Sequence, residues 1–290
     1  MVKIAIRQLL FAMFQYLGVN TVCRYLNRNK AAILYYHGVC SNQKDADKAP
    51  PLEIPEHILQ THLTWLTRMG YTYISLSNLV QRLKQGQPVG RHVAITFDDG
   101  FHSVVETAYD YLHREQAYGC CYVVADRAES AQQTPDEMNQ SGRDNGVPYS
   151  IRTASWDELL SMKSETMELG SHTKTHPNCT SVIDDALLVD EIVGSRREIE
   201  KNTGRNVSHF CYPNGDYSHR ITSQVRTAGY DSAVTTRHGL VAQGVDVFAL
   251  PRIIARPEPL FFAAEMSGVY EILIDRNRRA INRMLELFSL

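Results

Sequence analysis

The sequence lacks the patterns that identify several common classes of protein and enzyme. Its formal net charge is −2, so no basic excess indicates a nucleic-acid partner. No G-x-G-x-x-G fingerprint supports a nucleotide-binding sheet, and no G-x-S-x-G elbow supports a serine esterase. The H-x-H pair that barrel amidohydrolases and phosphoesterases commonly carry on an early strand is also missing. These absences disfavour each of those classes.

Cysteine is scarce, and its spacing does not indicate paired thiols. None of the six cysteines forms a C-x-x-C pair; they are Cys23, Cys40, Cys120, Cys121, Cys179 and Cys211. The adjacent residues Cys120 and Cys121 have an awkward geometry for a mutual disulfide. We therefore expect buried free thiols, which are typical of a reducing compartment.

No apolar run near the N-terminus is long enough to predict a membrane-spanning helix. Residues 3–29 contain four cationic side chains and no acid, and Gln8, Gln15 and Asn20 interrupt the apolar positions. No small-residue cleavage site follows, so a signal peptide is not indicated. We expect residues 1–30 to form an amphipathic helical segment, either on a membrane surface or packed against its own domain. With the free thiols, this predicts a cytoplasmic protein, peripheral at the inner membrane.

The rest of the chain, residues 31–290, reads as one domain in which strands alternate with helices. Hydrophobic residues make up 43% and charged residues 21%, enough to form a packed core. Strands are predicted at 31–36, 71–74, 92–97, 120–124, 167–170, 208–212, 232–235 and 247–250, with helices between them. Residues 126–153 lack periodicity and are predicted to form a long surface loop. Parallel strands with crossover helices at this length favour a (β/α) barrel, with a doubly wound sheet as the alternative.

Three polar clusters follow predicted strands, where barrel enzymes place their active sites. The first is T-F-D-D-G at residues 96–100, in which Asp98 and Asp99 would repel each other unless a cation such as a metal offsets them. The second is H-T-K-T-H at 172–176, whose two histidines can reach one metal ion. The third is a Tyr-Pro-Asn-Gly turn at 212–215, which can aim a backbone N–H at a developing oxyanion. Taken singly, each could also be an ordinary turn or a pair of surface histidines.

Together and in this order, the clusters resemble the polysaccharide deacetylase family, also called the NodB-homology or carbohydrate esterase family 4 type. T-F-D-D matches the first family motif, and H-T-x-x-H matches the second, H-[ST]-x-x-H. The resemblance covers roughly residues 33–252. It implies a distorted (β/α) barrel of about seven parallel strands and a hydrolase that removes N-acetyl groups from a glycan.

The resemblance also implies a role for each matched residue. Asp98 would be the general base, and Asp99 would bind one divalent metal together with His172 and His176. Three protein ligands with open positions suit catalytic Zn²⁺, although other divalent metals accept the same set. The turn formed by Tyr212, Pro213 and Asn214 would face the substrate, and the backbone N–H of Asn214 would help to hold the oxyanion.

The sequence departs from the family pattern at two points. The arginine that usually precedes the proline of the third motif is absent, because Phe210 and Cys211 occupy that region. We expect Arg252 to orient Asp98 in its place. The C-terminal L-x-H that usually supplies the general acid is missing, but Tyr36-His37 resembles the start of deacetylases encoded with exopolysaccharide synthesis. His37 is therefore the candidate general acid, and a structural histidine closing the barrel is the alternative.

The expected activity is metal-dependent removal of N-acetyl groups from a polysaccharide or from a lipid-linked or nascent glycan. O-deacetylation is one alternative, because the same chemistry cleaves esters. A non-catalytic glycan-binding protein on the same fold is another. The intact pair of Asp98 and Asp99 argues against the latter, since a binding protein has no need for a base beside a metal.

Overall fold

The computed structural model describes residues 16–41, 52–132 and 152–269 and contains a closed barrel of parallel strands. Going around it, the strands follow the order β1-β10-β9-β8-β7-β6-β5, and β5 pairs with β1 to close the ring. Every pairing in this ring is parallel. The strands are β1 (Ala32–Tyr36), β5 (His92–Phe97), β6 (Gly119–Val123), β7 (Met167–Ser171), β8 (His209–Cys211), β9 (Ser232–His238) and β10 (Leu250–Ile254). The predicted seven-stranded barrel is confirmed.

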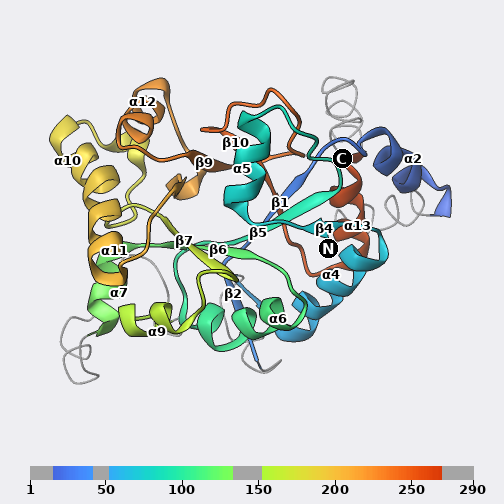
Figure 1. The fold of residues 1–290 in the computed structure, drawn as a ribbon, viewed down its shortest axis with the longest axis horizontal. Helices are drawn as coiled ribbons and strands as arrows, with labels where there is room; N and C mark the ends of the chain where they lie inside the picture. Colours follow the sequence, from blue (N-terminus) through green and yellow to red (C-terminus); the bar gives the residue numbers. More distant parts are fainter. Residues whose placement is uncertain (1–15, 42–51, 133–151, 270–290) are drawn as a thin grey trace, which may run out of the picture.

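Helices surround the ring and connect its strands (Figure 1). They include α4 (Glu56–Arg68), α5 (Leu76–Lys84), α6 (Tyr109–Arg114), α9 (Trp156–Ser161), α10 (Asp185–Val189), α11 (Ser195–Thr203), α12 (His219–Thr227) and α13 (Pro259–Ser267). Their starts follow from local chemistry: the Ser75 hydroxyl accepts from the Asn78 N–H, and Ser155 and Glu158 form a capping box. A short strand β4 (Thr72–Tyr73) adds to the outer edge of β5, and β2 (Gly38–Cys40) pairs with β3 (Glu53–Pro55).

Alternating side chains in each strand divide the core into two layers. In β5, Val93, Ile95 and Phe97 belong to the large cluster that packs against the surrounding helices. Ala94 belongs instead to a second cluster that also takes residues from β1, β6, β8 and β9, as expected for the barrel interior. The same alternation turns Thr96 and Asp98 inward, so the strand delivers a carboxylate to the axis of the barrel as it ends.

Two predicted segments differ in the structure. The predicted strand at 247–250 is wrong, because β10 spans Leu250–Ile254 and contains Pro251. The proline is tolerated since the ladder between β10 and β9 shifts register between Leu250 and Arg252, where a missing N–H costs no pairing. The start of the predicted loop 126–153 is helical, in α7 (Ala125–Gln132), and residues 133–151 lie outside the described residues.

The helix α2 (Val19–Leu26) is the described part of the expected N-terminal amphipathic segment. It packs against α13 through a small cluster of Cys23, Phe261, Ala264 and Val269. In the part of the chain that the structure describes, no helix has both the length and the apolar character needed to cross a bilayer. All six cysteines are buried and none forms a disulfide, as the sequence predicted.

Candidate active site

The polar side chains chosen from the sequence meet in one pocket at the carboxyl ends of the barrel strands. The pocket is lined by Tyr35, His37, Leu52, Asp98, Asp99, Arg127, His172, His176, Tyr212, Asn214 and Thr236. Apart from Leu52, which precedes β3, these residues lie in or shortly after six of the seven strands, and β10 supplies Arg252 from below. Because all strands are parallel, their carboxyl ends meet at the same rim, and motifs far apart in sequence converge there.

Asp98 is held by a two-point ion pair with Arg252. The arginine Nη1 lies 2.7 Å from Oδ1 of Asp98, and its Nη2 lies 2.8 Å from Oδ2. Arg252 is fully buried, and it also donates to the Thr235 carbonyl and the Thr96 hydroxyl. The planar guanidinium therefore fixes the orientation of the carboxylate plane. The structure thus places Arg252 where an orienting arginine would lie.

The ion pair also fixes the charge of Asp98. Burial would raise the pKa of this carboxyl, but the charge and hydrogen bonds of Arg252 outweigh burial and hold the pKa well below its usual range. Asp98 is therefore ionised at neutral pH and can accept a proton. The thiol of Cys211 lies 3.6 Å from Oδ1 of Asp98, and burial raises the pKa of this thiol, which keeps it neutral.

Asp99, His172 and His176 form a set that could hold a metal ion. Their ligand atoms all lie within 4.8 Å of one another. Nε2 of His176 is 3.5 Å from Oδ1 of Asp99, and Nε2 of His172 is 3.9 Å from the same oxygen. Ligands of a tetrahedral zinc ion are roughly 3.4 Å apart, given metal–ligand bonds of about 2.0–2.1 Å. The donor set therefore fits a divalent ion after small side-chain adjustments.

Hydrogen bonding and burial keep both histidines in the neutral form that can bind a metal ion. Nδ1 of His172 donates to the Cys211 carbonyl at 2.9 Å, which leaves Nε2 free to face the pocket. Burial lowers the pKa of His172, and burial followed by the nearby His172 lowers the pKa of His176 to about 4. Both rings are thus neutral at pH 7, as metal ligation requires.

Asp98, His172 and Cys211 also lie close enough to share an ion. We disfavour that set for two reasons. Arg252 balances the charge of Asp98 through a hydrogen bond to each carboxylate oxygen, and the raised pKa of Cys211 opposes formation of the thiolate that binds metals.

Several residues at the site have strained backbone conformations, which set the directions of their functional groups. Among the described residues, six non-glycine residues have positive φ, and four of them are Asp99 (69°), Thr173 (67°), His176 (66°) and Asn214 (59°). Such conformations cost free energy and persist where surrounding contacts enforce them. In the Pro-Asn-Gly turn, a Cβ on Gly215 would collide with Thr236, so only glycine fits there.

The remaining sequence candidates lie at or near the pocket. His37 lines it and makes an edge contact with Tyr35, with ring centroids 6.1 Å apart. Asn214 lines it as well, whereas Pro213 is buried in the turn. Tyr212 contributes to the lining, but its hydroxyl donates to the Phe248 carbonyl and the residue has no exposed surface. Its ring therefore supports the turn from inside the protein.

Sequence reasoning missed two charged residues of the site. Nη1 of Arg127 lies 3.3 Å from Oδ1 of Asp99, and this arginine follows β6 at the same rim, so the strand-end rule would have found it.

The second residue is Glu191, which is buried in the π-helical turn η3 (Asp190–Gly194) and accepts from the backbone N–H groups of Lys174 and Thr175 at 2.9 Å each. It also accepts from the Thr175 hydroxyl at 2.6 Å. These bonds hold the loop between His172 and His176.

We expect Glu191→Gln to weaken metal binding while leaving the ligands themselves intact. The amide keeps the size of the side chain but loses the charge that strengthens its three hydrogen bonds to the loop. Supporting contacts of this kind are typically worth about 10- to 100-fold in metal affinity, so we expect a loss of roughly 10-fold. Metal titration followed by calorimetry measures it. Glu198→Gln on α11 is the control, and equal affinities in the two variants would remove Glu191 from the site.

A family model described as polysaccharide deacetylase matches residues 85–233, about half of the chain. The chain is also 21% identical over 229 residues to YxkH, a Bacillus subtilis (strain 168) protein described as a polysaccharide deacetylase. That match covers 79% of this chain and 72% of the relative.

Two solved structures share the fold at lower identity. The Streptococcus pyogenes deacetylase PplD, solved in complex with acetate, matches with a TM-score of 0.69 and 20% identity over 82% of this chain and 98% of its own. IcaB from Ammonifex degensii matches with a TM-score of 0.66 and 18% identity over 83% of this chain and 97% of its own. The matched region contains both the T-F-D-D and H-T-K-T-H motifs. The chain therefore belongs to the polysaccharide deacetylase family.

Proposed function

We propose that this deacetylase hydrolyses N-acetyl groups of a polysaccharide or nascent glycan with the help of one divalent metal, most consistent with Zn²⁺. The observation that carries the proposal is the arrangement of two adjacent carboxylates with separate partners. Asp98 is clamped by Arg252, whereas Asp99 faces His172 and His176. One carboxylate is thus set apart for proton transfer and the other for metal binding.

A metal ion held by Asp99, His172 and His176 would supply Lewis acidity to the acetamide carbonyl and to the attacking water. Asp98, oriented by Arg252, takes the proton of that water. The backbone N–H of Asn214 would donate to the oxygen on which negative charge develops. His37, which also lines the pocket, would donate a proton to the leaving amine.

The proton transfer assigned to His37 has a kinetic signature. We expect His37→Gln to lower kcat about 10²-fold, the low end of the usual range for general acids, because water can partly replace the donor. Steady-state kinetics measures the loss. His57→Gln, an exposed histidine on α4, is the control, and an unchanged kcat in His37→Gln would contradict the role.

The reaction itself is tested by acetate release from a panel of acetylated glycans. Matched oligosaccharides that carry either N-acetyl or O-acetyl groups separate the two activities, because only amide hydrolysis exposes a free amine. Acetate with an equal amount of new amine supports the proposal. Acetate without amine would identify an O-deacetylase. Tight binding without acetate from any substrate would identify a glycan-binding protein.

We further propose a cytoplasmic location, where the enzyme would meet a lipid-linked or growing glycan. Six buried cysteines, none of them in a disulfide, support a reducing compartment. Cell fractionation should recover the protein in the cytosol or in a membrane pool that high salt releases. Recovery only from the periplasm or medium, or release only by detergent, would contradict this location.

A further inference from the structure

Helix α2 exposes the residues that a helix of a soluble protein usually buries. Among the described residues, five of the eleven exposed large hydrophobic side chains lie in or just before this helix: Tyr16 (91% exposed), Leu17 (63%), Val22 (59%), Tyr25 (60%) and Leu26 (62%). Asn20 in the same helix is buried, in contrast. Val22, Tyr25 and Leu26 are spaced so that they share one face of the helix. This apolar face marks an interaction surface.

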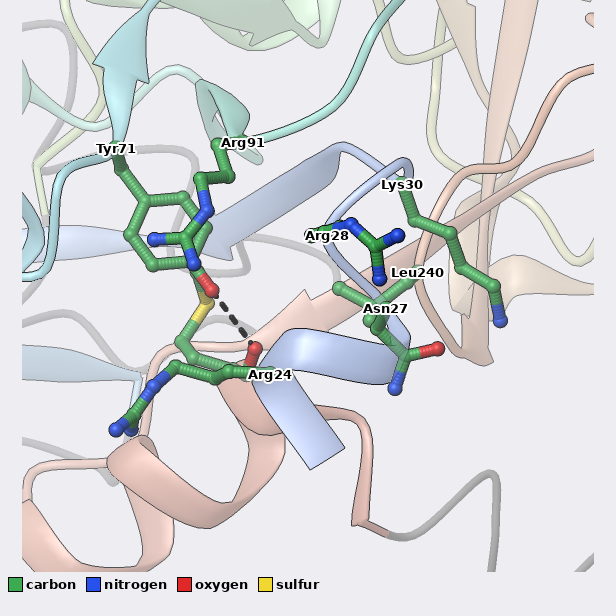
Figure 2. A pocket seen from close by; sticks show the side chains of 8 residues that line it. Arg24, Asn27, Arg28, Lys30, Tyr71, Arg91 and Leu240 are labelled. Atoms are coloured by element: carbon green, nitrogen blue, oxygen red, sulfur yellow. Dashed lines mark hydrogen bonds between the residues drawn. The ribbon is translucent and has the colours of Figure 1, made fainter. Parts of the chain in front are cut away.

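Cationic side chains surround the base of the same helix. A narrow pocket there is lined by Arg24, Arg28, Lys30 and Arg91 together with Asn27, Tyr71, Leu240 and Met266 (Figure 2). None of these lining residues is acidic. The four cations come from α2, from the turn after it and from the turn before β5, so the fold gathers charges that are separate in sequence.

Three of these cations keep their charge available. Nη1 of Arg28 donates to the Tyr25 carbonyl at 3.0 Å, and Nη1 of Arg91 donates to the Met69 carbonyl at 3.0 Å. Nη2 of Arg24 donates to the Thr21 hydroxyl at 3.1 Å. These partners are neutral, and within the described ranges no carboxylate forms an ion pair with any of the three guanidiniums. The positive charge of these three arginines is therefore held in place without being neutralised.

We propose that α2 and the adjoining cationic pocket form a docking surface for an anionic lipid leaflet. An apolar helix face supplies insertion into the interface, and the fixed guanidiniums attract lipid phosphates. Tyr25 suits the boundary, since its ring stacks under the Arg28 guanidinium at 4.2 Å and carries a polar hydroxyl. A second copy of this chain is a poorer occupant, because a symmetric contact would bring the two cationic clusters together.

The proposed surface lies at the opposite end of the barrel from the active site. Lys30 precedes β1 and Arg91 precedes β5, whereas Asp98 follows β5. Six strand residues separate these ends, which amounts to roughly 20 Å at about 3.3 Å per residue. Docking therefore leaves the catalytic pocket uncovered. This orientation favours a substrate segment that extends away from the bilayer. Sugars next to a lipid anchor would be farther from the pocket.

Vesicle flotation with the full chain tests the proposal without relying on any catalytic step. We expect binding to vesicles of phosphatidylcholine mixed with phosphatidylglycerol, little binding to phosphatidylcholine alone, and weaker binding as salt rises. Each lysine or arginine near an anionic surface is worth about five-fold in partition. Arg24→Gln/Arg28→Gln should therefore weaken binding on the order of 20-fold, and Val22→Ser/Tyr25→Ser/Leu26→Ser should weaken it further than a matched control.

The controls are Arg197→Gln/Lys201→Gln on α11 and Ile183→Ser/Leu187→Ser near α10, which remove exposed charge or apolar surface elsewhere. Both should bind as the unchanged protein does, as should the inactive Asp98→Asn. Equal binding to neutral and anionic vesicles, or unchanged binding of both α2 variants, would overturn the proposal. Light scattering could instead show that the unchanged protein is a dimer and that only the α2 variants are monomers. That result would assign the face to a second copy of the chain.

Discussion

Replacing His176 with alanine should leave a folded protein that holds no metal ion and releases no acetate. In the proposed set His176 supplies one of three ligands, and its ring is partly exposed, so its loss should remove coordination without opening a large cavity in the core. Metal-assisted polarisation supplies several kcal/mol of transition-state stabilisation, which corresponds to about 10³-fold or more in rate. Metal content measured by mass spectrometry and acetate release measured on the same sample check both effects. His172→Ala should behave in the same way.

The matched control is His219→Gln, an exposed histidine at the start of α12. It should keep full metal content and full activity. Retention of one metal ion per chain by His176→Ala would contradict the ligand set, whatever its activity.

Asp98→Asn should keep the metal and lose turnover. Asn preserves the shape of the side chain but cannot accept the proton of water, and general bases typically contribute about 10²–10⁴-fold to the rate. Because Asp98 is not among the proposed ligands, the metal content should stay near that of the unchanged protein. Steady-state kinetics and metal analysis of one preparation give both numbers.

This substitution also leaves the buried Arg252 without a charged partner, so we expect a less stable protein. Thermal unfolding must therefore show that the variant is folded at the assay temperature. Loss of metal from a folded Asp98→Asn would mean that the two carboxylates have exchanged roles.

The barrel could be predicted because its strands and helices are marked by local patterns. The predicted strand at 92–97 matches β5 residue for residue, since an apolar run there ends abruptly at two carboxylates. The strand that corresponds to β10 was predicted too early in the chain, because a proline such as Pro251 normally cannot occupy a position in a hydrogen-bonded ladder. The register shift against β9 makes room for it here. Helix α7 was missed because its sequence is polar and carries little periodicity.

The site was predictable where its residues are adjacent in sequence. Asp98 with Asp99, and His172 with His176, are short motifs that can be recognised one at a time. Glu191 carries no such mark, because its contacts with Lys174 and Thr175 depend on how a helical turn packs behind a loop.

The pairing of Arg252 with Asp98 joins residues 154 positions apart. It was expected only because the family pattern leaves an orienting arginine unaccounted for in this sequence. Contacts of this kind follow from the closure of the barrel, which strand pattern alone does not specify.

Acetate release by metal-stripped enzyme, before and after divalent metal is restored, tests the central claim most directly. The substrate is an N-acetylated oligosaccharide that the unchanged protein deacetylates. We predict that the stripped enzyme is inactive, that about one equivalent of Zn²⁺ restores release of acetate and amine in equal amounts, and that His176→Ala cannot be restored. Full activity of the stripped enzyme, or equal restoration of His176→Ala, would contradict a metal-dependent deacetylase built on Asp99, His172 and His176.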